Sequence, residues 1–177
     1  MDNENKKDGA VMGVVYILRG ISGSGKSTYA QKLIEEKQGV GVVVCSADDH
    51  FMHDGEYKFD PSKLSAAHRL CRDKFVKAMH DGIQTIVIDN TNTTRNEYLF
   101  YARHAQSNGY RLHVVTFDAD PELGISRNVH GVPDDVIRAQ HKRLVGDHTP
   151  TEFHETHIKA VGNYMIEYQD VELKDEH

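Results

Sequence analysis

The segment GISGSGKS, residues 20–27, combines residue types and spacing that are suited to holding phosphate. It matches the pattern GxxxxGK[ST], and it lies between an apolar run and a helical pattern, as a phosphate-binding loop requires. Glycines let a backbone wrap around phosphate oxygens with successive amides pointing inward, and the following helix presents its positive N-terminal end. The segment therefore predicts a nucleotide-binding loop, with a glycine-rich turn that holds no ligand as the alternative.

The polar residues of this loop have separate expected roles. We expect the Lys26 ammonium to reach the β- and γ-phosphates of ATP and the Ser27 hydroxyl to bind Mg²⁺. The residues predicted to contact the nucleotide are Gly20, Ser22, Gly23, Ser24, Gly25, Lys26, Ser27 and Thr28.

Acidic residues follow two other apolar runs. Asp89 ends the run TIVID, at the carboxyl end of an expected strand, and it is predicted to orient Mg²⁺ or its waters. Phosphoryl transfer to an alcohol needs a group that accepts the hydroxyl proton, and Asp48, which follows VVVCSA, fits this role. Asp49 is expected to cap the next segment or to hold a Mg²⁺ water. The alternative for Asp89 is an ordinary turn at the end of a strand, and the alternative for Asp48 and Asp49 is a pair of solvated acids at a strand end.

The elements that must position these residues are predicted by alternating apolar runs and helical patterns, which indicate a parallel sheet flanked by helices. Expected strands cover residues 11–18, 42–45, 85–88 and 112–117, all rich in β-branched residues. The segment YMIEYQDVEL, residues 164–173, is compatible with a last edge strand or with part of a helix. The fold class is α/β with a central parallel sheet of four to five strands.

Two helices have clear start and stop signals. The first opens with Asp60 as N-cap and Pro61 at the first helical position, and it stops at Gly82. The second begins with Thr94 and Glu97 in capping-box spacing and ends at residue 109. The apolar residues expected to face the core on the first helix are Leu64, Ala67, Cys71, Phe75 and Met79.

Length and composition bound the class of protein. With 177 residues we expect one domain, residues 11–177, after a flexible leader at residues 1–10 whose polar sequence is not a secretory signal. No apolar run approaches the length of a membrane span, so we expect no membrane role and a cytoplasmic location. Cys45 and Cys71 are expected to be buried free thiols. The net charge of −6 argues mildly against coating nucleic acid, although a local basic patch is compatible with it.

The twelve histidines do not predict a metal site. The segment HETH, from His154 to His157, is one residue short of the HExxH zinc spacing and has no evident third ligand, so a surface histidine pair is expected. His68 is placed on the inward side of its helix, as a core histidine or as an acceptor contact.

Four motifs together, GISGSGKST, SADDHF, IDNTN and RNVHGVP, resemble the P-loop polynucleotide kinase family over roughly residues 13–145. The family includes phage end-healing kinases and a kinase-like domain within larger eukaryotic proteins. The resemblance implies a P-loop NTPase three-layer sandwich with a helical lid, and transfer of the ATP γ-phosphate to a 5′-hydroxyl of DNA or RNA. It makes Asp48 the general base, Lys26 a catalytic cation, Ser27 and Asp89 the metal site, and Arg127 a lid residue.

The chain departs from the family pattern at two places. Phage members have an arginine three residues after the catalytic aspartate, where this chain has Phe51, which is expected to stack on a nucleobase instead. The lid is also a residue shorter, so the second lid arginine lacks a secure counterpart and His130 is nearest. Arg138 or Arg143 is then expected to assist Arg127. Some of the other basic residues are expected to line an acceptor groove, with an ordinary solvated helix face as the alternative for each one; they are Arg69, Arg72, Lys74, Lys77, Arg95, Arg103 and Lys142.

Three functional hypotheses follow. The first is a polynucleotide 5′-hydroxyl kinase whose substrate partner is a nucleic acid 5′ end. The second is a kinase for a small molecule such as a sugar, a nucleoside or an antibiotic, which Phe51 and the net negative charge favour. The third is a non-catalytic ATP-binding module, which would have no need of Asp48. The sequence makes no prediction of oligomeric state.

Overall fold

The computed structural model describes residues 10–148, 153–161 and 164–168. The expected leader at residues 1–10 therefore lies outside the described residues except for its last position. The part of the YMIEYQDVEL segment beyond residue 168 also lies outside them.

A six-stranded sheet with the order β2-β5-β1-β6-β7-β8 forms the centre of the molecule. Its strands are β1 (Gly13–Arg19), β2 (Val42–Cys45), β5 (Thr85–Asp89), β6 (Tyr110–Asp118), β7 (His154–Val161) and β8 (Tyr164–Tyr168). Neighbouring strands are parallel from β2 to β7, and β8 pairs antiparallel with β7. The predicted α/β fold with a parallel sheet is confirmed, with five parallel strands and one antiparallel edge strand.

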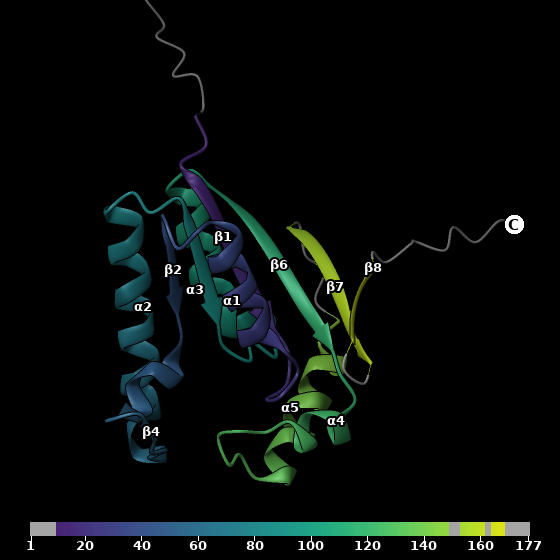
Figure 1. Ribbon diagram of the computed structural model, residues 1–177. Helices are drawn as coiled ribbons and strands as arrows, with labels where there is room; N and C mark the ends of the chain where they lie inside the picture. Colours follow the sequence, from purple (N-terminus) through teal and green to yellow (C-terminus); the bar gives the residue numbers. More distant parts are fainter. Residues whose placement is uncertain (1–9, 149–152, 162–163, 169–177) are drawn as a thin grey trace, which may run out of the picture.

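Helices cover both faces of this sheet (Figure 1). They are α1 (Lys26–Glu36), α2 (Leu64–His80), α3 (Arg95–Ser107), α4 (Pro121–Ser126) and α5 (Asp134–Gly146). The buried residues of α2 and α3 pack with Ile17, Ile88 and Val114 on one face, whereas those of α1 pack with Val87 and Phe117 on the other. The helices α4 and α5 lie at the carboxyl end of the strands, where ligands bind in open α/β sheets (Figure 1).

Local sequence signals explain where α2 and α3 begin. The Asp60 carboxylate accepts a hydrogen bond from the Ser62 amide at 2.9 Å and caps the 3₁₀ turn η2 (Pro61–Lys63), which leads into α2. The predicted Thr94–Glu97 capping box is wrong in detail, because the Thr94 side chain makes no capping bond. The Glu97 carboxylate instead accepts from the Thr93 amide at 2.7 Å and from the Thr93 hydroxyl at 3.0 Å.

The expected apolar stripe of α2 is largely correct. Ala67, Cys71, Phe75 and Met79 are buried, whereas the Leu64 side chain at the start of the helix is 41% exposed. Both cysteines are buried free thiols, as expected.

The HETH segment forms the start of β7 rather than a helix, because Thr156, Ile158 and Ala160 alternate inward as a strand requires. His154 and His157 therefore point to opposite faces of the sheet. The His154 ring lies 4.4 Å from the His113 ring, and His157 Nε2 lies 3.7 Å from a Glu155 carboxylate oxygen. Within the described ranges no three histidine, cysteine or acidic side chains gather as metal ligands, and no helix there is long and apolar enough to span a bilayer.

Arg19, a buried arginine at the end of β1, connects this strand to Asp147 at the C-terminal end of α5. Arg19 donates to the carbonyl oxygens of Asn92 at 2.9 Å and Thr93 at 3.1 Å. It also pairs with Asp147 at 2.9 Å, and the same carboxylate oxygen accepts from the Arg95 amide at 2.8 Å. A buried charge is stable only when it is paired and hydrogen-bonded, as the Arg19 guanidinium is. The network therefore holds the end of β1, where the phosphate-binding loop begins.

Candidate active site

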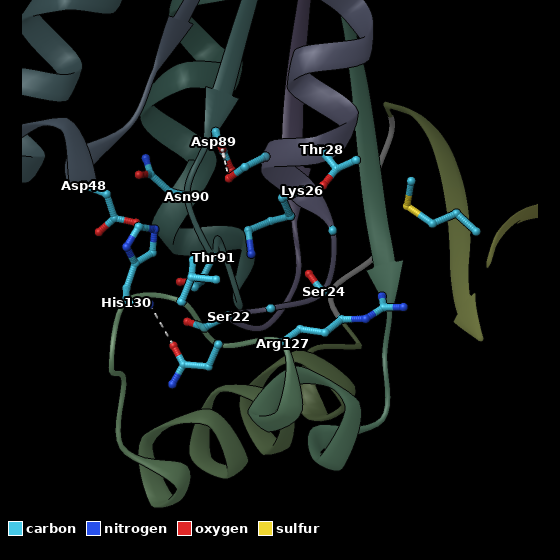
Figure 2. Close-up of a pocket in the computed structure, with 16 residues that line it drawn as sticks. Ser22, Ser24, Lys26, Thr28, Asp48, Asp89, Asn90, Thr91, Arg127 and His130 are labelled. Carbon is cyan, nitrogen blue, oxygen red and sulfur yellow. Dashed lines mark hydrogen bonds between the residues drawn. The ribbon is translucent and has the colours of Figure 1, made fainter. Parts of the chain in front are cut away.

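The loop between β1 and α1 is shaped by close backbone contacts. Gly23 has φ +77°, and a Cβ at this position would lie 2.2 Å from the Gly124 carbonyl oxygen, so α4 packs directly against the loop. On the same side the Ser22 amide donates to Gln140 Oε1 at 2.9 Å, which attaches α5 to the loop. The helical segment α4–α5 therefore supports the loop from below (Figure 2).

Lys26 lies inside the loop with only 8% of its surface exposed. Its Nζ donates to the carbonyl oxygens of Gly20 at 2.9 Å and Ile21 at 2.8 Å. Burial lowers the pKa of Lys26 to about 8, although the carboxylates of Asp89 and Asp48 oppose the shift. The Lys26 ammonium is thus held at the centre of the loop, where burial makes its charged form less favourable. An anionic ligand beside it would make the charged form more favourable again.

One buried polar atom in the loop has no hydrogen-bond partner among the described residues, the Ser24 hydroxyl. A buried hydroxyl without a partner costs free energy, so its presence beside Lys26 fits a loop that is completed by phosphate oxygens. Gly20 is predicted to contact the nucleotide, but it does not line the pocket. Its amide instead donates to the Thr91 carbonyl oxygen at 2.9 Å.

Ser27 and Asp89 form the pair expected of a magnesium site. The Ser27 hydroxyl donates to Asp89 Oδ2 at 2.8 Å, joining the start of α1 to the end of β5. Burial raises the pKa of Asp89, and the charge of Lys26 and the Ser27 bond oppose that shift. A hydroxyl and a carboxylate are oxygen ligands of the kind Mg²⁺ takes beside substrate phosphates, so these residues fit the metal.

Asp48 lies on the short 3₁₀ helix η1 (Ala47–Phe51) that follows β2. Asn90, directly after β5, holds this helix because its side-chain oxygen accepts from the Ala47 amide at 2.9 Å. The Asp48 carboxylate is exposed toward the pocket, and its Oδ1 accepts from the Tyr57 hydroxyl at 3.0 Å. Asp49 points elsewhere and pairs with Lys74 on α2 at 3.1 Å, so the expected contact with a Mg²⁺ water is wrong.

A pocket of roughly 480 Å³ brings these side chains together (Figure 2). Asp48 borders it from η1, Asp89 from β5 and Lys26 from the loop. The segment after α4 closes the remaining side with Arg127, Asn128, Val129 and His130. The other lining residues are Ser22, Gly23, Ser24, Gly25, Ser27, Thr28, Asn90, Thr91 and Met165. Every predicted catalytic and metal residue therefore lines one cavity.

Phe51 does not line the pocket, and the expectation that it stacks on a nucleobase is wrong. Its side chain is 1% exposed because the short helix turns it into the core. There it meets the ring of Phe59 at 5.1 Å and the ring of Tyr57 at 6.1 Å between centroids.

The two arginines expected to assist Arg127 make contacts outside the pocket. The Arg138 guanidinium is engaged with the Glu122 carboxylate at the surface. Arg143 Nε donates to the Thr93 hydroxyl at 3.2 Å, and neither residue lines the pocket. His130, the position nearest to the missing arginine, does line it. His68 is half-buried on α2 outside the lining, and burial lowers its pKa.

The expected basic groove along α2 is reduced by pairing. Lys74 and Lys77 each pair with an aspartate, and the Arg72 guanidinium lies 5.6 Å from the Phe100 ring centroid. The charges of the two lysines are thus paired locally, and none of these three basic residues lines the pocket.

Several residues that line or support the site have no role predicted from the sequence, among them Asn90, Tyr57 and Met165. Asn90 follows Asp89 in the motif IDNTN, where the sequence predicts a role for the aspartate alone. Tyr57 lies on a hairpin that the dipeptide Asp54-Gly55 indicates, since both residues have positive φ, of +51° and +81°. Met165 lies on β8, and no local pattern places that strand beside the loop.

The lowered pKa of Lys26 predicts a pH dependence of nucleotide binding. Phosphates favour the ammonium, so the Kd for ATP should be constant below about pH 7 and rise above about pH 8, by at most about tenfold per unit. Calorimetric titration of ATP between pH 6.5 and 9.5 measures this. Lys26→Arg stays protonated throughout and should give a flat profile. A flat profile for the unmodified protein would contradict the assignment of Lys26 to the phosphates.

A strand, a glycine-rich loop and a helix around a buried lysine, with a serine–aspartate pair beside it, define a P-loop nucleotide-binding fold. The family profile AAA_33, described as an AAA domain, matches residues 15–151. The chain therefore belongs to this family of P-loop, kinase-like domains, and the resemblance predicted from the four motifs is confirmed at the level of family.

Two relatives agree with this assignment. Human NEDD4-binding protein 2 is 35% identical over 136 residues, which cover 75% of this chain and 8% of the human protein. PM0531 of Pasteurella multocida (strain Pm70) is 30% identical over 143 residues, which cover 75% of this chain and 77% of that protein.

Solved structures share the fold. A chain of the Pnkp1/Rnl/Hen1 RNA repair complex has a TM-score of 0.65 at 19% identity, over 84% of this chain and 49% of that chain. A sugar kinase from Janibacter sp. HTCC2649 has a TM-score of 0.55 at 17% identity, over 83% of this chain and 84% of that chain. At these identities the likeness concerns the fold.

Proposed function

We propose that residues 11–177 act as an ATP-dependent kinase domain that transfers the γ-phosphate to the 5′-hydroxyl of DNA or RNA. The observation that supports it most is the arrangement of one pocket. A buried Lys26 and the Ser27–Asp89 pair lie at the nucleotide end, and an exposed carboxylate, Asp48, lies on a different element facing the same cavity. A module that only bound nucleotide would have no use for Asp48.

In the proposed reaction Asp48 accepts the proton of the acceptor hydroxyl as that oxygen bonds to the γ-phosphorus. The bond from the γ-phosphorus to the β–γ bridging oxygen breaks, and ADP leaves with that oxygen. Lys26 and Arg127 stabilise the negative charge on the transferring phosphoryl group and on the leaving phosphate. Mg²⁺, held by Ser27 and Asp89, would neutralise phosphate charge when it is bound.

The choice of a polynucleotide acceptor rests on the four motifs and on family membership. The likeness to a chain of an RNA repair complex agrees with it. A small-molecule alcohol is the second candidate. Among the described residues that line the pocket, the lysines and arginines are Lys26 and Arg127, so no further lysine or arginine lines it to bind an acceptor phosphate.

The test is transfer of labelled γ-phosphate from ATP with Mg²⁺ to matched oligonucleotides that carry either a 5′-hydroxyl or a 5′-phosphate. We expect label on the 5′-hydroxyl strand alone, with both DNA and RNA versions assayed at several salt concentrations. Nucleosides and sugars serve as competing acceptors in the same assay. Label on a small acceptor alone would replace the proposal with the second candidate, and nucleotide binding without any transfer would favour a non-catalytic module.

A further inference from the structure

The hairpin β3 (Met52–His53) and β4 (Glu56–Tyr57) brings one aromatic residue to the acceptor side of the pocket. Tyr57 pairs with Met52 across the hairpin, and its half-buried side chain extends toward η1. The Tyr57 hydroxyl donates to Asp48 Oδ1 at 3.0 Å. Among the described residues, the Tyr57 hydroxyl is the side-chain donor to the Asp48 carboxylate.

The ring of the same tyrosine contacts the segment that closes the other side of the pocket. The centroids of the Tyr57 and His130 rings lie 4.2 Å apart, with planes tilted by 39°. His130 belongs to the loop at residues 127–133 between α4 and α5, here named the lid loop, and it lies beside Asp48 (Figure 2). Tyr57 therefore touches both the carboxylate and the lid loop.

We propose that Tyr57 is a positioning residue that orients the Asp48 carboxylate through its hydroxyl and holds the lid loop through its ring. This inference rests on the proposed function, because it concerns the group assigned there as the base. It means that base alignment and lid position depend on one side chain, which belongs to none of the four motifs.

The Asp48 side chain is exposed. An exposed carboxylate samples several rotamers, and a base must lie within hydrogen-bond reach of the proton that it accepts. A donor on Oδ1 restricts that freedom and leaves Oδ2 for the acceptor hydroxyl. Burial and the neighbouring Asp48 charge raise the pKa of Tyr57, so its hydroxyl remains a donor at neutral pH.

Most residues of the lid loop are exposed. Val129 is 84% exposed, and the loop is braced internally by Asn128, whose Oδ1 accepts from the amides of His130 at 3.3 Å and Val132 at 3.2 Å. Among the described residues, the Tyr57–His130 ring contact joins this loop to the hairpin. Close aromatic pairs stabilise a contact beyond simple burial.

Tyr57→Phe separates the two roles, because it deletes the hydroxyl and keeps the ring. We expect kcat for phosphate transfer to fall about tenfold, with the KM for ATP and the melting temperature unchanged. Tyr110→Phe is the matched control, since it deletes a hydroxyl that donates to the Ile83 carbonyl at 2.9 Å at the other end of the sheet. That control should leave kcat unchanged.

A double-mutant cycle decides whether the hydroxyl acts through the carboxylate. In an Asp48→Asn background the Tyr57→Phe change should cost less than about twofold, because no base remains to be oriented. The orienting role would be overturned if Tyr57→Phe lowered kcat tenfold in both backgrounds. It would also be overturned if Tyr57→Phe alone left kcat unchanged while Asp48→Asn abolished transfer. Either result would leave the proposed function standing.

Hydrogen exchange of the amides at residues 128–132 tests the lid contact without any catalytic readout. Tyr57→Ala and His130→Ala should each raise exchange in this loop several-fold, and Tyr57→Phe should not. Equal exchange in all four proteins would overturn the lid role. If the unmodified protein transfers phosphate to no acceptor, the proposed function and the orienting role both fail, and the lid role is still decided by exchange.

Discussion

Asp48→Asn is expected to lower phosphate transfer by about a thousandfold or more while the Kd for ATP changes less than about twofold. The amide keeps the size and shape of the side chain and can still accept from the Tyr57 hydroxyl, but it cannot take up a proton at neutral pH. General-base catalysis typically contributes factors of about 10² to 10⁴. Because Asp48 lies on η1 rather than on the phosphate-binding loop, nucleotide binding should not need it.

Asp49→Asn is the matched control for this prediction. It makes the same chemical change one residue later, at a carboxylate that pairs with Lys74 outside the pocket. Single-turnover transfer assays with saturating ATP, together with ATP titrations, measure both quantities. Equal losses in the two variants would show that the segment, and not the Asp48 carboxylate, is responsible.

Lys26→Met is expected to lower transfer by about a thousandfold and to weaken ATP binding by at least about tenfold, without lowering thermal stability. Methionine retains a flexible apolar stem and removes the ammonium that faces the phosphates. Loss of one preorganised donor to a transition state typically costs about 10²- to 10³-fold, and here ground-state binding of the phosphates is lost as well.

The stability part of this prediction follows from the buried charge. Burial lowers the pKa of Lys26 from an ordinary 10.5 to about 8, which corresponds to a penalty of about 3 kcal/mol for keeping the ammonium in the fold. At pH 7 the lysine is charged in both states and the penalty is fully present. It disappears as the pH rises from about 8 to 10.5, because the unfolded chain then binds more protons.

Methionine carries no such penalty, although the two bonds to loop carbonyls are lost with the ammonium. Melting curves at pH 7 should therefore show an unchanged or higher midpoint for Lys26→Met. Lys32→Met, at an exposed position of the same helix, is the control that should change neither stability nor transfer. A clear loss of stability in Lys26→Met would mean that the ammonium is a structural group of the loop.

The parts of this fold that could be predicted from the sequence are those where local pattern and tertiary role agree. The buried parallel strands are short β-branched runs, as at Thr85–Asp89, because both of their faces are covered. The phosphate-binding loop is equally local, since its function lies in its own backbone and in Lys26 and Ser27. Strand order was not predicted, because it depends on crossovers that leave no periodic trace.

The errors concern residues whose orientation is set by distant contacts. Phe51 was placed beside the acceptor from its spacing to Asp48, but a 3₁₀ turn and the aromatic partners around it direct the ring into the core. β7 is not predicted because the inward positions that alternate with its histidine, glutamate and lysine include the polar Thr156 and the weak strand former Ala160, so the apolar half of the pattern is weak. The hydrogen bond from Tyr57 to Asp48 spans a hairpin whose strands are two residues long, too short for an alternating pattern to be visible.

β8 brings a residue from outside the family match to the pocket. Met165 on that strand lines the pocket, and its sulfur would lie 3.1 Å from a Cβ at Gly25, yet β8 falls beyond residues 15–151 that match the family. One wall of the pocket is therefore built by a part of the chain that the family match does not include. The pocket can be reshaped by substitution at Met165 while the phosphate-binding loop, Asp48 and Asp89 stay unchanged.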